Sequence, residues 1–377
     1  MLFRSKQPPD GYRVEPVHAT ADQPGYRYAR QFTLGFLGCQ ADILGDEPIA
    51  YYAGDVFVGL DLQPEIAPAQ NSVYQAMRRQ GVSVQFVVYD LLLLQLPHCF
   101  PDVGASFFER WLNVVAQADG AVCISKSVAD ELATWLEAHG PKRDRPFMLN
   151  WFHLGANFDR SVPTAGLPGN ASTVIAGLRT RPSFLMVGTV EPRKGHAQAL
   201  AAFEALWAQG ENVNLAIVGK QGWMVDRLAE KLRAHPELGN RLFWLEDISD
   251  EFLEKVYAAS TCLIAASEGE GFGLPLIEAA RHKLPIIARD IPVFREVAGE
   301  HAAYFAGKAP GDLAHCVIAW LQLHAVGRHP TSAGMPCLTW AESAKQLIEA
   351  VKINRARPTF IVPNPPRDRQ YGVSDGD

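Results

Sequence analysis

The sequence predicts an α/β protein with two doubly wound domains that face a cleft. Short apolar segments alternate with amphipathic segments from about residue 53 to residue 352, and this alternation is typical of parallel β-α-β units. A stretch rich in Gly, Pro, Ser and Thr at residues 161–181 divides the series into two halves. A chain of 377 residues is long enough for two such domains. We therefore place the boundaries at 1–165 for the first domain, 166–181 for the linker, 182–345 for the second domain, and 346–377 for a helix end and a disordered tail.

The first domain begins with a segment that has little pattern, in which residues 26–39 are a short helix or irregular. After it the alternation is regular, and we expect Ser125 or Ser127 to cap the last helix of this domain. The predicted strands are 54–62, 82–88, 120–125 and 147–152, and the predicted helices are 72–80, 107–118 and 127–139. An apolar loop is expected at 91–100.

The second domain repeats the pattern after the linker. Its apolar runs are the length of buried parallel strands, and Ser249 stands where an N-cap is expected. The predicted strands are 182–187, 212–219, 241–245, 261–266, 284–288 and 302–305. The predicted helices are 196–209, 223–234, 249–259, 276–283, 293–299, 311–323 and 340–352.

Composition excludes several classes of function. The net charge of -6 argues against a nucleic-acid partner. The six cysteines are scattered without a Cys-x-x-Cys pair, which favours reduced thiols in a cytoplasmic protein. No run of 18 apolar residues and no apolar signal-peptide core is present. We see no His, Cys or Asp at metal-ligand spacing, no Asp-x-Asp after a strand, and no Gly-x-Gly-x-x-Gly at the start of a domain, so neither a metal nor a dinucleotide is expected.

The most informative stretch is Ser-Glu-Gly-Glu-Gly-Phe-Gly-Leu-Pro-Leu-Ile-Glu at residues 267–278. It follows the predicted strand 261–266, and its glycines allow a tight turn and a close approach of the backbone to a ligand. Pro275 favours the first turn of the next helix. A strand, a glycine turn and a helix N-terminus together form an anion site, here flanked by the carboxylates of Glu270 and Glu278.

A basic pair follows the first strand of the second domain. Arg193 and Lys194 stand between that strand and the helix 196–209, so their charges can stabilise an anion bound at this end of the sheet. Gly188 lets the backbone approach phosphates, and Thr189 adds a hydroxyl. Lys220 ends a neighbouring strand, where it either contacts phosphate or sugar or is an exposed turn residue.

Two glutamates separated by seven residues around Gly-Phe-Gly-Leu-Pro resemble the nucleotide-sugar motif of family 4 retaining glycosyltransferases, which have the two-domain, Rossmann-like GT-B architecture. The resemblance implies that Glu270 contacts the donor sugar and Glu278 the ribose. The Glu-Pro-Arg-Lys-Gly at 191–195 resembles the family's diphosphate grip, and residues 243–249 lie where the family holds the base. The donor-binding loop would include Gly271, Phe272, Gly273 and Leu274.

On the first domain, the resemblance indicates a polar residue at a strand end. Asp90 has this place, and we expect it to contact the sugar or the acceptor hydroxyl; alternatively it forms a turn or caps a helix. His98 and Ser125 are weaker acceptor-side candidates, and packing is the alternative role for His98. The expected catalytic set is therefore Glu270, Arg193, Lys194 and Asp90.

The resemblance implies a retaining, metal-independent transferase without a cofactor, closest to bacterial O-antigen mannosyl- or rhamnosyltransferases. The favoured donor is GDP-mannose or a related GDP-deoxyhexose, and the acceptor is a growing or lipid-linked glycan. We expect a cytoplasmic protein, and this acceptor class is compatible with peripheral contact with the inner membrane. A UDP-sugar donor is one alternative.

The family usually opens with a hydrophobic strand and a glycine-rich acceptor loop, which we do not find in residues 1–40. Either that unit is degenerate or the chain is a piece of a longer, multidomain glycosyltransferase, and we favour the second explanation. A non-catalytic nucleotide-sugar- or glycan-binding module of a larger polymerase is therefore the alternative from another functional class.

Overall fold

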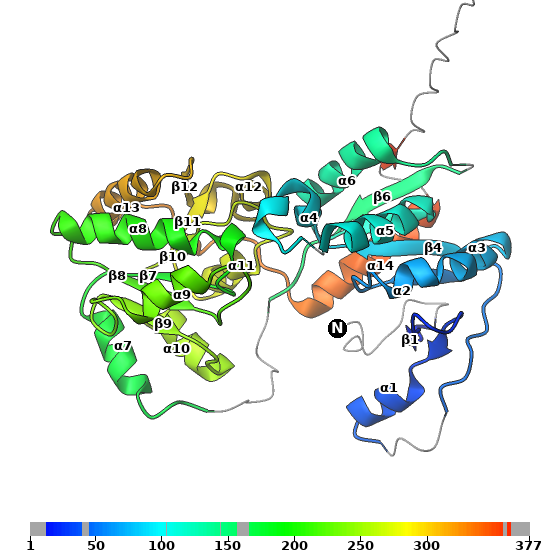
Figure 1. Ribbon diagram of the computed structural model, residues 1–377, viewed down its shortest axis with the longest axis horizontal. Coiled ribbons are helices and arrows are strands. Elements are labelled where there is room, and N and C mark those ends of the chain that lie inside the picture. The colour runs from blue at the N-terminus through cyan, green and yellow to red at the C-terminus, as the bar shows by residue number, and fades with distance from the viewer. Residues whose placement is uncertain are drawn as a thin grey trace, which may run out of the picture.

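The computed structural model describes residues 13–39, 45–102, 104–143, 145–156, 166–356 and 360–362. Two lobes lie side by side in Figure 1, and each is built around a parallel sheet flanked by helices. This is the two-domain α/β architecture that the alternating pattern predicts.

The first domain contains a five-stranded sheet in the order β13-β6-β5-β4-β3. Its parallel strands are β3 (Val56–Gly59), β4 (Ser83–Val88), β5 (Gly120–Cys123) and β6 (Phe147–Trp151). Both faces of these strands are covered, so β5 is buried along its whole length. The helices are α2 (Ile66–Ala69), α3 (Asn71–Arg79), α4 (Leu92–Gln95), α5 (Gly104–Gln117) and α6 (Lys126–His139), with a 3-10 turn, η3, at Pro97–Cys99.

The segment before β3 forms a small unit of its own. Strands β1 (Val17–His18) and β2 (Arg27–Tyr28) pair antiparallel and are followed by α1 (Arg30–Phe36). Within the described residues, β3 pairs only with β4 and is the edge of the sheet. Residues 1–12 and 40–44 of this predicted patternless segment lie outside the described ranges.

The second domain contains six parallel strands in the order β12-β11-β10-β7-β8-β9. They are β7 (Ser183–Val187), β8 (Asn214–Val218), β9 (Leu242–Leu245), β10 (Cys262–Ala265), β11 (Ile286–Arg289) and β12 (Ala303–Phe305). The chain proceeds from β7 toward one edge and from β10 toward the other. Since ligands bind where the strand order reverses, the carboxyl ends of β7 and β10 are the expected binding position.

The helices of the second domain agree with the sequence pattern. They are α8 (His196–Ala208), α9 (Asp226–Arg233), α10 (Asp250–Ala259), α11 (Leu274–Arg281), α12 (Pro292–Ala298) and α13 (Pro310–Ala325), with 3-10 turns η4 (Pro192–Lys194) and η5 (Gly299–His301). The predicted N-cap is confirmed, because the Ser249 hydroxyl accepts a hydrogen bond from the Phe252 amide at 3.2 Å.

The predicted linker boundary is wrong. Residues Ala171–Arg179 form helix α7, and Leu178 is fully buried in the second domain's core. The Ser183 hydroxyl donates a 2.5 Å hydrogen bond to the Leu178 carbonyl, which ties the helix to β7. The Gly, Pro, Ser and Thr of residues 161–181 favour a linker, although five of the nine residues of α7 are apolar. Residues 157–165 lie outside the description.

The predicted C-terminal boundary is also wrong. Helix α14 (Trp340–Ala356) returns to the first domain and packs against its sheet (Figure 1). There, the Gln85 amide donates to the Val351 carbonyl at 3.2 Å. Beyond the helix, Phe360–Val362 form β13, which pairs antiparallel with β6. The predicted disordered tail thus contains a strand, and its residues 357–359 and 363–377 are outside the described ranges.

The two domains share a buried apolar cluster and a polar clasp. The cluster joins Val122 and Phe152 of the first domain to Phe272 of the second. The clasp is Glu296 on α12, which accepts hydrogen bonds from the Lys126 amide at 2.7 Å, the Ser127 amide at 2.8 Å and the Ser127 hydroxyl at 2.6 Å. The His153 ring also lies 2.8 Å from Glu296. A carboxylate from one domain therefore caps a helix of the other.

These bonds stabilise the charged form of Glu296. Burial alone would raise the pKa of this carboxyl, but the hydrogen bonds from His153, Ser127 and the Lys126 amide outweigh burial and lower the pKa to about 2. The ionised clasp is therefore part of the folded state at neutral pH.

We predict that Leu178→Ala lowers the free energy of unfolding by about 2–5 kcal/mol, because it opens a cavity in the core. Arg179→Ala, at the exposed neighbouring position, is the control and should change stability by less than about 0.5 kcal/mol. Denaturant titration measures both. Equal, small effects would show that α7 is a linker after all.

We predict that Glu296→Gln destabilises the protein by about 2–3 kcal/mol above pH 5, because an ionised partner of the α6 N-terminus is lost. The native pKa is below the unfolded value, so this contribution is present above about pH 4.5 and is lost as the pH falls toward 2. The difference in melting temperature from the wild type should shrink over that window. Glu300→Gln, at an exposed position, should show no such pH dependence. A pH-independent difference would contradict the clasp.

Candidate active site

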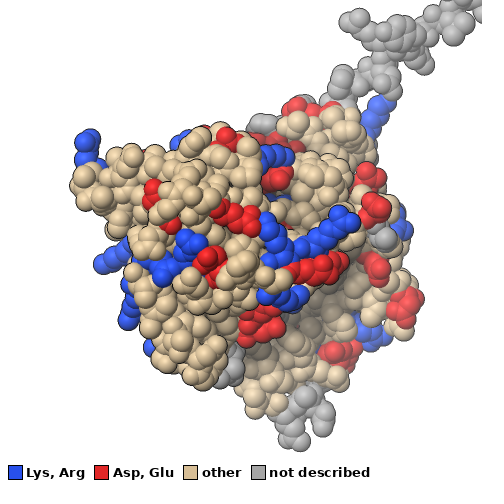
Figure 2. Space-filling view, turned by 60° about the vertical axis from the view of Figure 1, so that its left-hand side comes forward, with Lys and Arg blue, Asp and Glu red and all other residues tan. Residues whose placement is uncertain are grey.

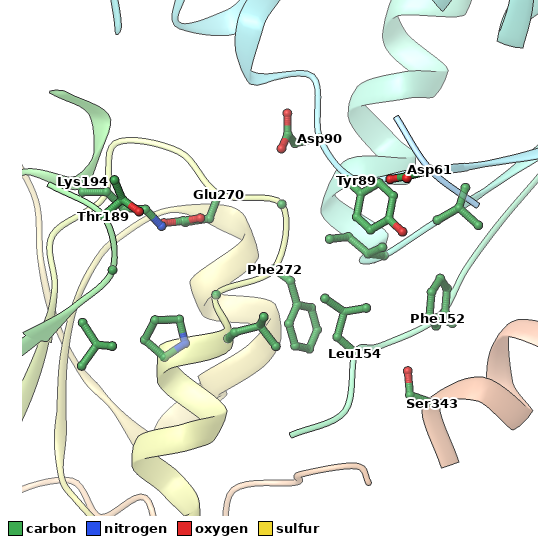
Figure 3. Close-up of a pocket in the computed structure, with 18 of the residues that line it drawn as sticks. Asp61, Tyr89, Asp90, Phe152, Leu154, Thr189, Lys194, Glu270, Phe272 and Ser343 are labelled. Carbon is green, nitrogen blue, oxygen red and sulfur yellow. The ribbon is translucent and has the colours of Figure 1, made fainter. Parts of the chain in front are cut away.

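A cavity of about 900 Å³ lies between the domains, at the carboxyl ends of β7 and β10. Figure 3 shows its two sides: Thr189, Lys194, Glu270 and Phe272 come from the second domain, and Asp61, Tyr89 and Asp90 from the first. Ser343 of α14 lies at the lower margin of the view. Of the residues predicted from the sequence, this cavity brings together Asp90, Gly188, Thr189, Arg193, Lys194, Glu270, Gly271, Phe272, Gly273 and Leu274.

The basic pair is held in the short turn η4. Gly195 ends this turn with φ 74°, and a Cβ at Gly195 would lie 2.4 Å from the Ala266 carbonyl oxygen. Only glycine permits both the left-handed backbone and this close approach to the end of β10. The sequence Arg-Lys-Gly therefore places both cations beside the glycine loop, residues 269–273, that follows β10.

Glu270 is the partner of both cations. Its carboxylate accepts hydrogen bonds from Lys194 Nζ and, at 2.7 Å, from the Ser267 hydroxyl, and Arg193 Nη1 lies 3.0 Å from its other oxygen. Burial alone would raise the pKa of Glu270, but Lys194 and Arg193 together with the hydrogen bonds lower it. A buried, ionised carboxylate thus stands between two cations at the wall of the cavity.

Glu191 completes this charge cluster. Its carboxylate is 2.6 Å from Arg193 Nη2, and its side chain is only 2% exposed. Burial raises the pKa of Glu191, which Arg193 and Lys194 partly offset. The wall thus contains two cations and two carboxyl groups, and an incoming anion would compete with the carboxylates for the same donors.

The glycine loop of residues 269–273 is seated directly against the first domain. A Cβ at Gly271 would lie 2.0 Å from the Tyr89 carbonyl oxygen, and one at Gly269 would lie 2.7 Å from the Leu92 side chain. Gly273 has φ 99°, so it turns the chain into α11. The loop then ends at Leu274 and Pro275 in the first turn of that helix, whose free amides favour an anion.

Asp90 lies on the opposite wall, after β4. Its Oδ1 accepts a hydrogen bond from the Leu92 amide at 3.1 Å, so it also has the turn-forming role that the sequence left open. Burial raises the pKa of Asp90, and the charge of Glu270 adds to this increase. Asp90 therefore faces the charge cluster across the cavity.

Four predicted residues do not line this cavity. Glu278 accepts a 2.7 Å hydrogen bond from the Tyr257 hydroxyl, and burial raises its pKa. Lys220 is exposed in the turn after β8. His98 is exposed on η3, 4.0 Å from Glu268.

Ser125, the fourth, joins the domains. Its hydroxyl caps α6 by accepting from the Val128 amide at 3.1 Å, and it donates to the Gly271 carbonyl at 2.8 Å. It therefore fixes the glycine loop from the first domain, and of the two predicted caps of α6 it is the one that the structure contains.

Sequence reasoning missed several residues of the wall. Trp223 follows β8, stacks on Phe100 with ring centroids 5.8 Å apart, and donates to the Cys99 carbonyl at 2.8 Å. Trp340 and Ser343 come from the start of α14, which we expected to belong to the second domain. The one usable sign in the sequence was a tryptophan in the connection between β8 and α9, and no local pattern signals the contacts of Trp340 and Ser343.

One cluster of potential metal ligands occurs among the described residues. It comprises His98, Cys99 and Glu268, whose ligand atoms lie within 4.8 Å of one another. The carboxylate of Glu268 also accepts from Lys308 Nζ. No spacing in the sequence predicts this cluster, because Glu268 comes from the other domain. The cluster lies beside the cavity and is not part of its lining.

The family comparison matches the second domain. Residues 175–331 match the family described as glycosyl transferases group 1. The chain is 48% identical over 358 residues to the serotype-specific mannosyltransferase WbdA of Escherichia coli, a match that covers 93% of this chain and 43% of that protein. The chain thus spans less than half the length of this relative. O-antigen chain mannosyltransferase B of Escherichia coli is 32% identical over 120 residues, 31% of this chain and 30% of that protein.

Solved structures show the fold. Sucrose-phosphate synthase from Thermosynechococcus elongatus superposes with a TM-score of 0.58 at 18% identity, covering 80% of this chain and 74% of that one. Anabaena HepE in complex with UDP superposes with a TM-score of 0.55 at 16% identity, covering 80% of this chain and 77% of that one. Both cover the two Rossmann-like domains. Residues 175–331 of this chain therefore form a glycosyltransferase group 1 domain, within a protein of the GT-B fold.

Proposed function

We propose that this chain transfers a mannosyl residue from a nucleotide-diphosphate sugar to a growing surface polysaccharide or a lipid-linked glycan. The observation that carries the proposal is the buried Glu270 between Arg193 and Lys194 at the wall of the interdomain cavity. The 48% identity to a protein named a mannosyltransferase supports the choice of sugar. GDP-mannose is the donor that we favour, without a further cofactor.

The charge cluster suits a diphosphate leaving group. When the bond between the sugar and the diphosphate breaks, negative charge grows on the leaving oxygen, and preorganised cations stabilise it. Arg193 offers a forked guanidinium and Lys194 a compact ammonium, next to the free amides at the start of α11. In this proposal no metal is required to neutralise the leaving group.

In the proposed retaining mechanism, the acceptor hydroxyl approaches from the first domain, on the face from which the diphosphate leaves. The departing phosphate takes the hydroxyl proton, so no separate base is needed. Glu270 orients the sugar and offsets positive charge on its ring, and Asp90 binds the sugar or the acceptor from the opposite wall. In this proposal, closure of the domains around the donor excludes water from the reacting centre, and the glycine loop already contacts the first domain at Tyr89 and Ser125.

Two alternatives to this proposal are a non-catalytic binding module and an enzyme that uses a UDP-sugar donor. A non-catalytic binding module would keep the cavity without needing a carboxylate between the cations, so the buried Glu270 favours the enzyme. A UDP-sugar donor leaves the same diphosphate chemistry and changes only the base contact.

We further propose that the protein acts in the cytoplasm, against the inner membrane where lipid-linked acceptors are found, as part of a longer glycosyltransferase. All six cysteines are free thiols, which suits a reducing compartment. Among the described residues, no helix is long and apolar enough to span a membrane. On the face shown in Figure 2, basic side chains lie beside acidic ones and form no continuous basic surface, which does not favour a nucleic-acid partner.

The proposal predicts that the purified chain transfers labelled mannose from GDP-mannose to a mannan primer, and that Glu270→Gln lowers kcat by about 10²–10³-fold, the size of effect expected when one electrostatic contact to the transition state is lost. Glu268→Gln, which removes the same charge from the same loop outside the cavity, should stay within about threefold. Circular dichroism and melting temperature control for folding. Unchanged transfer by Glu270→Gln would sink the assigned role of this carboxylate.

A second prediction concerns the donor class. GDP at 100 times its Kd should raise the free energy of unfolding by roughly 2.7 kcal/mol, measurable as a thermal shift, with little effect of UDP or ADP. Lys194→Ala should weaken GDP binding by about 10–100-fold, since a hydrogen bond to a charged group contributes about 1.5–3 kcal/mol. Guanosine binding and the exposed control Lys255→Ala should be unaffected. A larger shift with UDP would instead favour the UDP-sugar alternative.

A further inference from the structure

His196 is a buried histidine whose polar atoms the fold leaves unused. It is the first residue of α8, directly after the basic turn, and is 2% exposed. Neither ring nitrogen has a hydrogen-bond partner among the described residues. A buried polar atom without a partner is unfavourable, so two on one ring require an explanation.

The imidazole faces a small cavity behind the charge cluster. This cavity has a volume of about 20 Å³ and is lined by His196, Lys194, Ser267 and Glu270, with apolar walls that include Met186 and Phe294. One water needs about 10–15 Å³ and two to four polar partners. The cavity has room for a single water, and its polar side chains are sufficient to bind it.

The charge state of the imidazole is compatible with binding a water in this cavity. Burial, together with the smaller effect of the neighbouring Lys194 charge, lowers the pKa of His196 to about 3. The ring is therefore neutral, with one nitrogen that donates and one that accepts. A neutral ring can orient a water without repelling the Lys194 ammonium.

Glu270 will need such a water when a diphosphate binds. In this structure its carboxylate is satisfied by Lys194, Arg193 and the Ser267 hydroxyl. A diphosphate would draw both cations toward itself and leave Ser267 as the remaining donor. A buried carboxylate that loses its donors tends to take up a proton, and a protonated Glu270 would no longer offset positive charge on the sugar.

We propose that His196 holds an ordered water in the small cavity, and that this water donates a hydrogen bond to Glu270 when the nucleotide diphosphate engages Lys194 and Arg193. The second half of this proposal rests on the proposed function. His196 is then a positioning residue, because it acts on the substrate only through the water and Glu270.

The charged groups that face Glu270 set the expected pH dependence. Arg193 and Lys194 from η4 favour its ionised form, and Glu191 on the same segment and Asp90 from the first domain oppose it. Without the water donor, the ionised form loses support only in the diphosphate-bound state. The acid limb of kcat should therefore move to higher pH, and by linkage Kd for GDP at neutral pH should rise by about tenfold for each pH unit of that move.

The variants are His196→Phe, which keeps a planar aromatic ring, although a larger one, and removes both nitrogens, and His196→Gln, which keeps a donor and an acceptor. The control is Met186→Leu, a volume-conserving change in the same cavity wall. We expect the acid limb of kcat to shift upward by about one pH unit in His196→Phe, to return most of the way in His196→Gln, and to stay in place in Met186→Leu. A kcat that falls equally at every pH in His196→Phe would overturn the positioning role.

Crystal structures of the wild type, free and with GDP, test the water without any assay of transfer. We expect an ordered water within about 2.7–3.2 Å of a His196 ring nitrogen in both, and within the same reach of Glu270 in the GDP complex. A dry cavity would overturn the proposal even if mannose transfer is found. An ordered water in a chain that transfers no mannose would support the water site and count against the proposed function.

Discussion

The rest of the site depends on one constraint, a buried carboxylate held ionised between two cations. Glu270 is tolerable inside the protein only because Arg193 and Lys194 face it and Ser267 donates to it, since an isolated buried charge is strongly unfavourable. The turn η4 and the glycine loop must therefore form together, which explains the close approach of Gly195 to Ala266. An anionic ligand enters this balance by taking over the cations.

The same loop is also the meeting point of the two domains. Gly271 approaches the Tyr89 carbonyl so closely that a side chain would not fit, and its own carbonyl accepts from Ser125. At the same interface, Glu296 of the second domain caps helix α6 of the first. Because the residues that hold the charge cluster also contact the first domain, the position of the domains and the geometry of the cluster are coupled.

Much of this arrangement could be predicted from the sequence, because it is encoded locally. The strands, the glycines at strand ends, the pair Arg193–Lys194 and Glu270 in its glycine-rich turn are short-range patterns with a direct physical meaning, whereas Glu278, which the same motif suggested, bonds to Tyr257 outside the cavity. The contacts of Ser125 with Gly271 and of Glu296 with His153 join residues 146 and 143 positions apart, and no local pattern specifies them. Helix α7 differs from the prediction for another reason: the Gly, Pro, Ser and Thr in and around it are typical of a linker, and the burial of Leu178 against the core is what fixes the helix.

Helix α14 shows why the domain boundaries mattered for the site. It begins after the second domain, packs on the first, and contributes Trp340, Ser343 and Leu347 to the cavity between them. The chain therefore crosses between the domains twice. It crosses first in the stretch between β6 and α7, and it returns to the first domain at α14. The cavity is thus lined both by the helix that returns to the first domain and by the loop that carries Glu270, so the position of the two domains sets its width.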